Sequence, residues 1–582
     1  MKPLIQILCI MSASLVALTA EPTEENGAVS GSNVSPVWIN QVGYHPQQQK
    51  WAVISDQNAK AFRIVDAEGN GSTLFEGTIG ESAYWEPLQR EVALVDFSDF
   101  RTPGRFLIIT DTGATSAPLI IRDQALRELS KAAIKAFYFS RASFELEPAY
   151  AGKWARPAGH PDDQILIHAS AASDTRPEGT VVSAPKGWYD AGDYNKYIVN
   201  SGISTYTLLL AYRMFPEYYN GLDLNIPESG NEIPDLLNEI KWNLDWMLAM
   251  QDPADGGVYH KLTTLTFEPA VLPHLLSDPR YMVMKSTPAA YNFAAVMAMA
   301  SRIWKPFDAA YANTCLQAAL SAWEWAKANP DILYKQPEDV HTGHYGDKDI
   351  RDEHFWAAAE LYLATNQEKF MEVARSIDCE IGVPGWNAVG ILGHYSLAVE
   401  KQLPESISVI REQADKELRL ANRSAAKVGM ENKDYIWGSN AVAANKSMLL
   451  LIAHRLTGDT ESLSIACDKL NYILGKNPTG YCFVTGFGER PVMNPHYRPS
   501  MGDDLEDPHP GFLSGGPNHQ RHDAKWVSGY LGDAPAMAFC DEEASYATNE
   551  IAINWNAPLS FIAGAVEAIM EASAAPEPST DE

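Results

Sequence analysis

The stretch "DQALRELSKAAIKAFYFSRASFEL", residues 123–146, marks the point where the character of the sequence changes. Its apolar residues recur at helical spacing, and an acidic residue stands near its start, as is typical of a helix N-terminus. About twelve segments of this kind occur up to residue 572. They include 232–251, 287–304, 352–365 and 439–456. Most of the chain is therefore predicted to be helical.

The residues before this stretch have a different pattern. Short β-type runs are separated by turn signals such as Thr102-Pro103-Gly104. The runs are "KWAVISD" (50–56), "AFRIVDA" (61–67), "REVALVDF" (90–97), "GRFLIIT" (104–110) and "APLIIRD" (117–123). Short strands at this spacing predict a small β-sandwich over 36–122, followed by a helical domain over 123–572. No fixed-period repeat occurs, which favours a toroid of paired helices over a solenoid.

The ends of the chain carry their own signals. Lys2, the apolar run 4–18 and Ala20 predict an export signal over 1–20, hence a secreted or periplasmic protein. The exact cut is open, and a noncleaved anchor or a buried helix is the alternative. Residues 21–35 are predicted to be a flexible lead-in and residues 573–582 a disordered tail.

Composition excludes several classes of protein. The formal charge of −29 disfavours nucleic acid and anionic polysaccharides as partners, but not neutral or cationic glycans. No long apolar stretch follows the N-terminus, so no membrane span is expected. Beyond residue 20 the cysteines are few, odd in number and never spaced as C-x-x-C. No disulfide framework is therefore expected, and a cysteine zinc site has no support in the sequence.

Two stretches bring carboxylates together with apolar or aromatic residues. "GWYDAGDYNKYIVNSG", 187–202, places Asp190 and Asp193 three residues apart around a glycine. A turn is the simple interpretation, and a carboxylate pair that holds a water is the other. "FCDEEASYATNEIAINWNAP", 539–558, sets Glu550 before an apolar run, which would raise its pKa. Glycoside hydrolysis needs such a proton donor and a second carboxylate that activates water.

A third stretch, "CFVTGFGERPVMNPHYRPS" at 482–500, offers His496 and Arg498 as donors to sugar hydroxyls. Either could instead belong to a solvated surface pair. Aromatic side chains near the three stretches could stack on pyranose rings, although a tryptophan in a helical domain usually packs in the core. The candidates are Trp188, Trp437 and Tyr546, with Tyr189, Tyr194 and Trp555 beside them.

Together the three stretches resemble glycoside hydrolase family 9, the family of many cellulases. The stretch 482–500 departs from the family pattern at Cys482 and Tyr497. "INQVGYHP", 39–46, is similar to the start of the immunoglobulin-like module found in one branch of the family. The positions that match the two C-terminal motifs are Phe539, Asp541, Tyr546, Glu550, Ala552, Asn556 and Ala557, and Thr485, Gly488, Arg490, Pro495, His496 and Arg498.

The resemblance implies an (α/α)6 toroid of helical hairpins, preceded by a small immunoglobulin-like β-sandwich. It implies an inverting hydrolysis with Glu550 as general acid, Asp193 as general base and Asp190 helping to hold the water. Substrate-binding roles fall to His496, Arg498, Tyr546, Trp437 and Trp188.

The resemblance also bears on metals. Members of this branch hold zinc in a Cys/His cluster, whereas Ala142 and Gly159 stand where the cysteines would fall and only His160 remains. No zinc and no required cofactor are expected. A structural calcium ion is compatible with the resemblance, with no ligands assigned.

The predicted function is an exported, endo-acting β-1,4-glucan hydrolase of cellulose-type chains. One alternative is an exo-acting glucosidase or glucosaminidase on oligosaccharides, since an acidic chain would suit a cationic chitosan fragment. A more distant alternative is a noncatalytic glycan-binding protein. The sequence leaves the preferred polymer, the product length and the oligomeric state open.

Overall fold

The computed structural model describes residues 34–69 and 71–574. The predicted export signal lies outside these residues, as do most of the predicted lead-in and most of the predicted tail. From Val34 onward the described chain forms one unit, so contacts can be followed between its parts.

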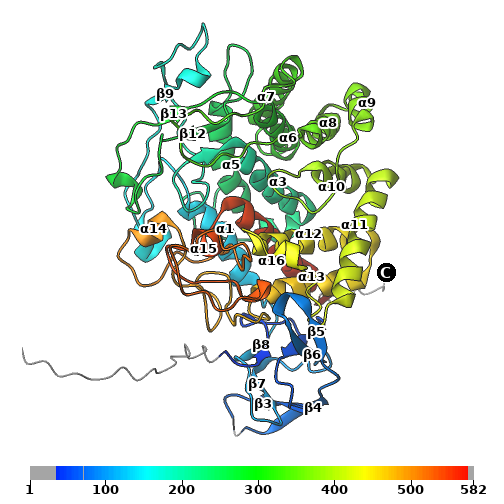
Figure 1. Cartoon of the computed structure of the whole chain (residues 1–582). Helices are drawn as coiled ribbons and strands as arrows, with labels where there is room; N and C mark the ends of the chain where they lie inside the picture. Colours follow the sequence, from blue (N-terminus) through cyan, green and yellow to red (C-terminus); the bar gives the residue numbers. More distant parts are fainter. Residues whose placement is uncertain (1–33, 70, 575–582) are drawn as a thin grey trace, which may run out of the picture. The chain divides into compact units, whose positions relative to one another are not determined.

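The N-terminal part is a β-sandwich of two four-stranded antiparallel sheets, drawn in blue in Figure 1. One sheet has the order β1-β2-β6-β5 and the other β4-β3-β7-β8. Alternate side chains of the strands point inward, and residues such as Ile54, Phe62 and Ile108 form a common core. The predicted β-sandwich is therefore confirmed. Its strands are β1 (Val37–Trp38), β2 (Trp51–Ile54), β3 (Ala61–Asp66), β4 (Thr73–Thr78), β5 (Ala83–Trp85), β6 (Arg90–Asp96), β7 (Gly104–Thr110) and β8 (Leu119–Ile121).

The rest of the described chain is an (α/α)6 toroid, as predicted (Figure 1). Six inner helices contact one another in sequence order, and the ring closes where α16 meets α3. The inner helices are α3 (Ile198–Met214), α6 (Thr287–Trp304), α8 (Arg351–Thr365), α10 (Gly390–Lys401), α12 (Ser439–Thr457) and α16 (Ile553–Ala574). Each outer helix packs on the inner ring. The outer helices are α1 (Arg127–Phe139), α5 (Asp235–Ala249), α7 (Ala309–Ala328), α9 (Glu368–Ser376), α11 (Pro404–Arg423) and α13 (Thr460–Ile473).

The inner and outer helices differ in how their apolar residues are distributed. Inner helix α6 is apolar around its whole circumference, and its many alanines allow neighbouring helices to approach closely. Outer helix α11 is strongly amphipathic and buries only one stripe of residues. Within the described residues, no helix combines the length and the apolar character that crossing a membrane requires. The remaining short helices are α2 (Pro148–Ala151), α4 (Pro216–Asn220), α14 (Arg498–Met501) and α15 (Tyr546–Asn549).

The helical domain also contains a small sheet that the sequence analysis did not predict. Its strand order is β10-β9-β13-β12-β11. Each strand has only two or three residues, too few to show a period-two pattern. The sheet matters for the site because β11 lies in the same stretch as the two aspartates, three residues after Asp193. The strands are β9 (Ile165–Ile167), β10 (Val181–Val182), β11 (Lys196–Tyr197), β12 (Lys261–Thr263) and β13 (Tyr281–Met282).

Buried polar contacts join the β-sandwich to the toroid. Glu567 on α16 is fully buried and accepts hydrogen bonds from His45 (3.0 Å) and from the backbone N–H of Leu126 (2.8 Å). Asn40 donates to the side chain of Asn471 on α13 at 2.9 Å. The two parts therefore share an interface with specific hydrogen bonds, as the short connection between β8 and α1 requires.

Candidate active site

A cleft of about 710 Å³ lies where loops precede the N-termini of several inner helices. Asp193 lies just before α3, Trp437 before α12 and Glu550 before α16. The ring of helices thus brings together side chains from distant parts of the sequence. All of the predicted site residues except Trp188 line this cleft.

Gly192 joins the stretch with the aspartates to the stretch with Glu550. Its backbone N–H points at Glu550 Oε1 at 3.4 Å, across 358 residues of sequence. Its carbonyl accepts a hydrogen bond from Nη1 of Arg498 at 2.6 Å. A Cβ at this position would lie 2.5 Å from the carbonyl oxygen of His496. The glycine is therefore needed for close approach, which a simple turn would not require.

Asp190 is a buried carboxylate with a hydrogen bond to each oxygen. The Asn200 amide donates to Oδ1 at 2.6 Å, and the Tyr345 hydroxyl donates to Oδ2 at 2.7 Å. Burial, together with the nearby charge of Asp193, raises the pKa of Asp190. The backbone is fixed as well, because the carbonyl of Asp190 accepts from the N–H of Ile553 at the start of α16 (2.8 Å).

Asp193 is held through one oxygen only. The Asn195 amide (2.5 Å) and the Tyr197 hydroxyl (3.0 Å) both donate to Oδ2. Among the described residues, none donates a hydrogen bond to Oδ1, the other carboxyl oxygen, and Asp193 lines the cleft. The second oxygen is therefore available to a water.

Glu550 lies across the cleft in surroundings that favour its neutral form. Burial and the charges of Asp193 and Asp190 raise the pKa of Glu550 to about 8. The Trp437 indole N–H donates to Oε2 at 3.1 Å and fixes the carboxyl group. A carboxyl group of this pKa carries a proton at neutral pH and can donate it.

His496 and Arg498 both help to build the cleft wall. Nδ1 of His496 donates to the carbonyl of Glu543 at 2.6 Å, which leaves Nε2 for another partner. Nε of Arg498 donates to the carbonyl of Glu268 at 2.7 Å, and its Nη1 holds Gly192. Arg498 therefore positions the stretch with the aspartates as well as lining the cleft.

Aromatic side chains form one wall of the cleft. Trp437 is 41% exposed, and its ring lies 5.2 Å from that of Tyr546. Trp555 lines the same wall. The exposed ring of Trp437, beside the carboxyl group of Glu550, is suited to stacking on a pyranose.

Residues 127–563 match the family model described as glycosyl hydrolase family 9, and residues 32–115 match the cellulase N-terminal ig-like domain. The chain belongs to glycosyl hydrolase family 9. A xyloglucan-specific endo-β-1,4-glucanase of Bacteroides ovatus is 42% identical over 91% of this chain and 93% of its own. A cellodextrinase of Butyrivibrio fibrisolvens is 32% identical over 90% of this chain and 98% of its own. A solved Bacteroides ovatus GH9 structure is 41% identical, covers 92% of this chain and 99% of its own, and superposes with a TM-score of 0.86.

The structure corrects one prediction for this family 9 glycoside hydrolase. Trp188 does not line the cleft, because it is fully buried, packs on Phe137 at 4.6 Å and donates its indole N–H to Glu239 at 2.8 Å. Tyr189 and Tyr194 are also buried. These rings support the stretch with the aspartates from behind and offer no face to a sugar.

Some cleft residues of the family 9 enzyme were missed from sequence. Tyr345 and Trp386 also line the cleft, on connections that precede α8 and α10. Neither lies in a recognisable motif. The one available signal was the long connection between α7 and α8, since long ordered loops often carry function.

The residues at the positions of the family's zinc ligands make other contacts in this structure. The carbonyl of Gly159 accepts from the N–H of Ser143, the residue after Ala142. His160 bonds to the Tyr189 hydroxyl (2.9 Å) and to Glu268 (3.1 Å). In the part of the chain that the structure describes, no three His, Cys, Asp or Glu side chains are placed to hold a metal.

Glu353 is a buried carboxyl group whose surroundings would favour a bound cation. Neither carboxyl oxygen of Glu353 has a hydrogen-bond partner among the described residues. Burial and the adjacent Asp352 raise its pKa far above the ordinary range. Two adjacent acidic side chains, Asp352 and Glu353, offer the oxygen ligands that calcium prefers.

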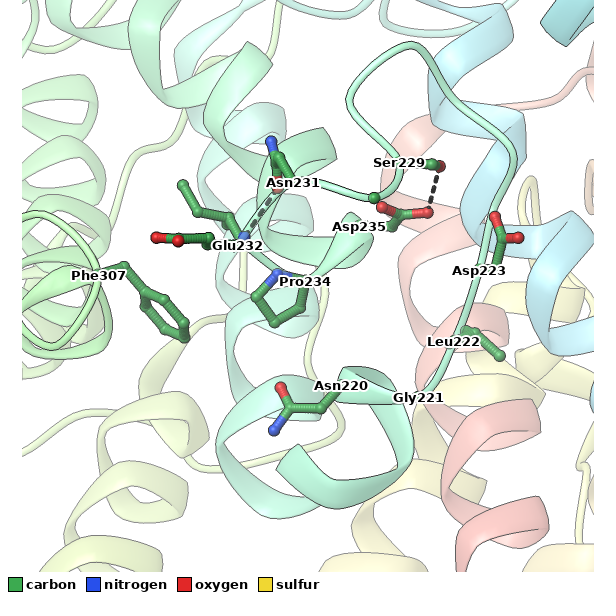
Figure 2. A pocket seen from close by; sticks show the side chains of 12 residues that line it. Asn220, Gly221, Leu222, Asp223, Ser229, Asn231, Glu232, Pro234, Asp235 and Phe307 are labelled. Carbon is green, nitrogen blue, oxygen red and sulfur yellow. Dashed lines mark hydrogen bonds between the residues drawn. The ribbon is translucent and has the colours of Figure 1, made fainter.

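A second hollow, of about 620 Å³, lies beside α5 and the loop before it (Figure 2). Its polar groups mostly shape that loop. Asp235 accepts from Ser229 (2.5 Å) and from the N–H of Leu224 (2.8 Å), and Asn231 accepts from the N–H of Ile233 (2.8 Å). None of the predicted site residues lies there, so we assign the active site to the first cleft.

Proposed function

We propose that the enzyme hydrolyses β-1,4-glucosidic bonds within cellulose-type glucans by an inverting single displacement. Glu550 acts as general acid and Asp193 as general base. One observation carries this assignment: a buried carboxyl group, whose raised pKa favours its protonated form, shares an aromatic-walled cleft with an aspartate that has one oxygen without a donor among the described residues.

The proposed reaction uses each contact of the site. A glucosyl unit stacks on Trp437, and Glu550 transfers its proton to the departing glycosidic oxygen. Asp193 Oδ1 takes a proton from a water whose oxygen bonds to the anomeric carbon from the opposite face. Asp190, fixed by Asn200 and Tyr345, accepts the second hydrogen bond from that water. The product has the opposite anomeric configuration, because one displacement occurs.

The stereochemistry of the first product tests this mechanism. Proton NMR during early hydrolysis of a β-glucan is expected to show the α-anomer before mutarotation. Early β-anomer would mean a covalent intermediate, and the role of Asp193 as base would be wrong.

The relatives named as endoglucanases support endo-action. The 42%-identical relative is named as a xyloglucan-specific endoglucanase, while another is named as a cellodextrinase. Exo-action on oligosaccharides is therefore the second candidate. Endo-action predicts a rapid loss of viscosity with few new reducing ends on carboxymethylcellulose or xyloglucan. A slow loss of viscosity, with cellobiose or glucose released from the start, would favour exo-action, and chitosan oligomers test the amino-sugar alternative.

Two further properties belong to this proposal. Export rests on the pattern of residues 1–20 and places the enzyme outside the cytoplasm, where polymeric glucans occur. A calcium ion would bind at Glu353 and Asp352, where it would take the place of the proton that burial favours on Glu353. Calcium would stabilise the start of α8 and of the loop before it, with no part in the chemical step.

A further inference from the structure

Lys261, on β12, is a buried cation with no carboxylate partner in the described part of the chain. Its ammonium donates to three neutral oxygens: the carbonyl of Gly343 (2.7 Å), the hydroxyl of Thr342 (3.0 Å) and the side-chain carbonyl of Gln336 (3.2 Å). By contrast, the buried Lys476 lies 2.7 Å from an aspartate. A buried, unpaired ammonium is costly, so its place beside the active site calls for an explanation.

The main chain that Lys261 holds lies against the proposed base. The N–H of Gly343 donates to the hydroxyl oxygen of Tyr197 at 3.0 Å, and that hydroxyl donates to Asp193 at 3.0 Å. A Cβ on Gly343 would lie 2.8 Å from the same hydroxyl, so this close approach requires glycine. Lys261 and Tyr197 are also directly paired between β12 and β11. A short chain of contacts thus runs from the ammonium to Asp193.

The same segment, residues 342–345, also reaches Asp190. Tyr345 has a left-handed backbone (φ 44°), an unfavourable conformation that its surroundings must hold. Its hydroxyl donates to Asp190 at 2.7 Å, and its ring packs 4.7 Å from that of Tyr197. The segment therefore places one tyrosine hydroxyl on each aspartate.

We propose that Lys261 is a positioning residue, which locks segment 342–345 against the two aspartates and offsets their mutual repulsion with its charge. This inference rests on the proposed function, because it assumes that Asp190 and Asp193 hold the attacking water. Lys261 does not touch the substrate, since it lies behind Tyr197 and does not line the cleft.

The charge of Lys261 should be lost near neutral pH. Burial lowers the pKa of Lys261 to about 7, and attraction to Asp193 opposes this shift. The other titratable groups that face it are Tyr197, Tyr334, His260 and His344. The ammonium of Lys261 is thus charged below about pH 7 and loses its charge as the pH rises through that value. Its contribution to kcat should decrease over the same range.

The test uses 2,4-dinitrophenyl β-cellobioside, whose leaving group needs no proton, so that the titration of Glu550 does not mask that of Lys261. In the wild-type enzyme, kcat should fall as pH rises through about 7. Lys261→Met should lower kcat about 10- to 100-fold at pH 6, with little change in KM, and should remove that fall. Lys261→Arg keeps the charge and should recover much of the rate and carry it to higher pH.

Lys50→Met is the matched control. Lys50 is also buried, and its ammonium bonds only to the carbonyls of Pro46, Gln48 and Ser98 in the β-sandwich. Its replacement should lower Tm and leave kcat and the pH profile unchanged. Wild-type kcat that stays flat from pH 6 to 8 on this substrate, or a folded Lys261→Met enzyme with wild-type kcat, would overturn the inference.

Asp193→Ala is assayed alongside to separate two failures. An inactive Asp193→Ala enzyme beside an unaffected Lys261→Met enzyme refutes only the role of Lys261. An Asp193→Ala enzyme with wild-type activity refutes the proposed base itself. A flat wild-type pH profile overturns the inference without any variant, and Lys261→Arg keeps the inference testable if Lys261→Met does not fold.

Discussion

Glu550→Gln is the substitution that most directly tests the proposed chemistry. Glutamine keeps the shape of the side chain and can still accept the indole hydrogen bond of Trp437, but it has no acidic proton to give. The cleft should therefore stay intact while proton donation is lost.

The size of the effect follows from the surroundings of Glu550. With its pKa raised to about 8, about nine in ten Glu550 side chains carry a proton at pH 7. A glutamic acid of ordinary pKa would be protonated in fewer than about one molecule in a hundred. The site thus multiplies the available acid by roughly two orders of magnitude. General acid catalysis itself contributes about 10²- to 10⁴-fold, and we expect kcat on glucans to fall by that factor.

The assay compares initial rates on a soluble β-glucan and on 2,4-dinitrophenyl β-cellobioside. The variant should lose far less activity on the second substrate, because dinitrophenolate leaves without a proton. Beyond the fall near pH 7 expected from Lys261, wild-type activity on glucan should decline further as pH rises through about 8, where Glu550 loses its proton. Glu506→Gln, an exposed position on the loop before α15, is the matched control and should behave as wild type. Equal losses on both substrates, or a loss on glucan below about tenfold, would refute Glu550 as the general acid.

Three further outcomes are expected. Asp193→Ala should lower kcat at least about 100-fold on both substrates, because the water then has no base, and azide should restore part of the rate on the activated substrate; rates insensitive to the substitution would contradict this. Glu567→Ala removes the buried acceptor of His45 and of the N–H of Leu126, and each lost hydrogen bond should lower the free energy of unfolding by about 1–3 kcal/mol. Calorimetry should therefore show a lower Tm, and rate assays should show an unchanged kcat. An unchanged Tm would show that the interface does not stabilise the toroid. Calcium should raise the Tm and EDTA should lower it, and Glu353→Gln should abolish both changes; a Tm that responds to neither reagent would count against the calcium site. Metal analysis should find no zinc, and one zinc per chain would contradict that expectation.

The fold could be predicted because its signals are long and local. Each inner or outer helix runs for at least nine residues, enough for the helical period to appear, and the β-sandwich has several strands that alternate in burial. The sheet of β9–β13 could not be predicted in this way. Its strands are two or three residues long, and their pairing depends on a toroid that is already folded.

The site could be predicted where several chemical residue types stand together in one stretch. Trp188 and Trp437 show the limit of that approach, because both are tryptophans near a motif. Only the packing separates them: Trp188 finds a buried acceptor in Glu239, whereas Trp437 stays 41% exposed in the cleft. Tyr345 could not be found at all, since it contacts Asp190 across 155 residues from a loop without a motif.

The glycine between the two aspartates shows how the acid and the base are kept in register. A turn would explain Gly192 by backbone freedom, yet its φ is not in the left-handed region that favours glycine. What the position requires is the absence of a side chain, because a Cβ would meet the carbonyl of His496 at 2.5 Å. Through this contact the backbone of the aspartate stretch reaches Glu550 by its N–H and Arg498 by its carbonyl. Main-chain groups at one glycine thus tie the aspartate stretch to the proposed acid and to Arg498, while Asp193 keeps one carboxyl oxygen without a donor in the described chain for the water.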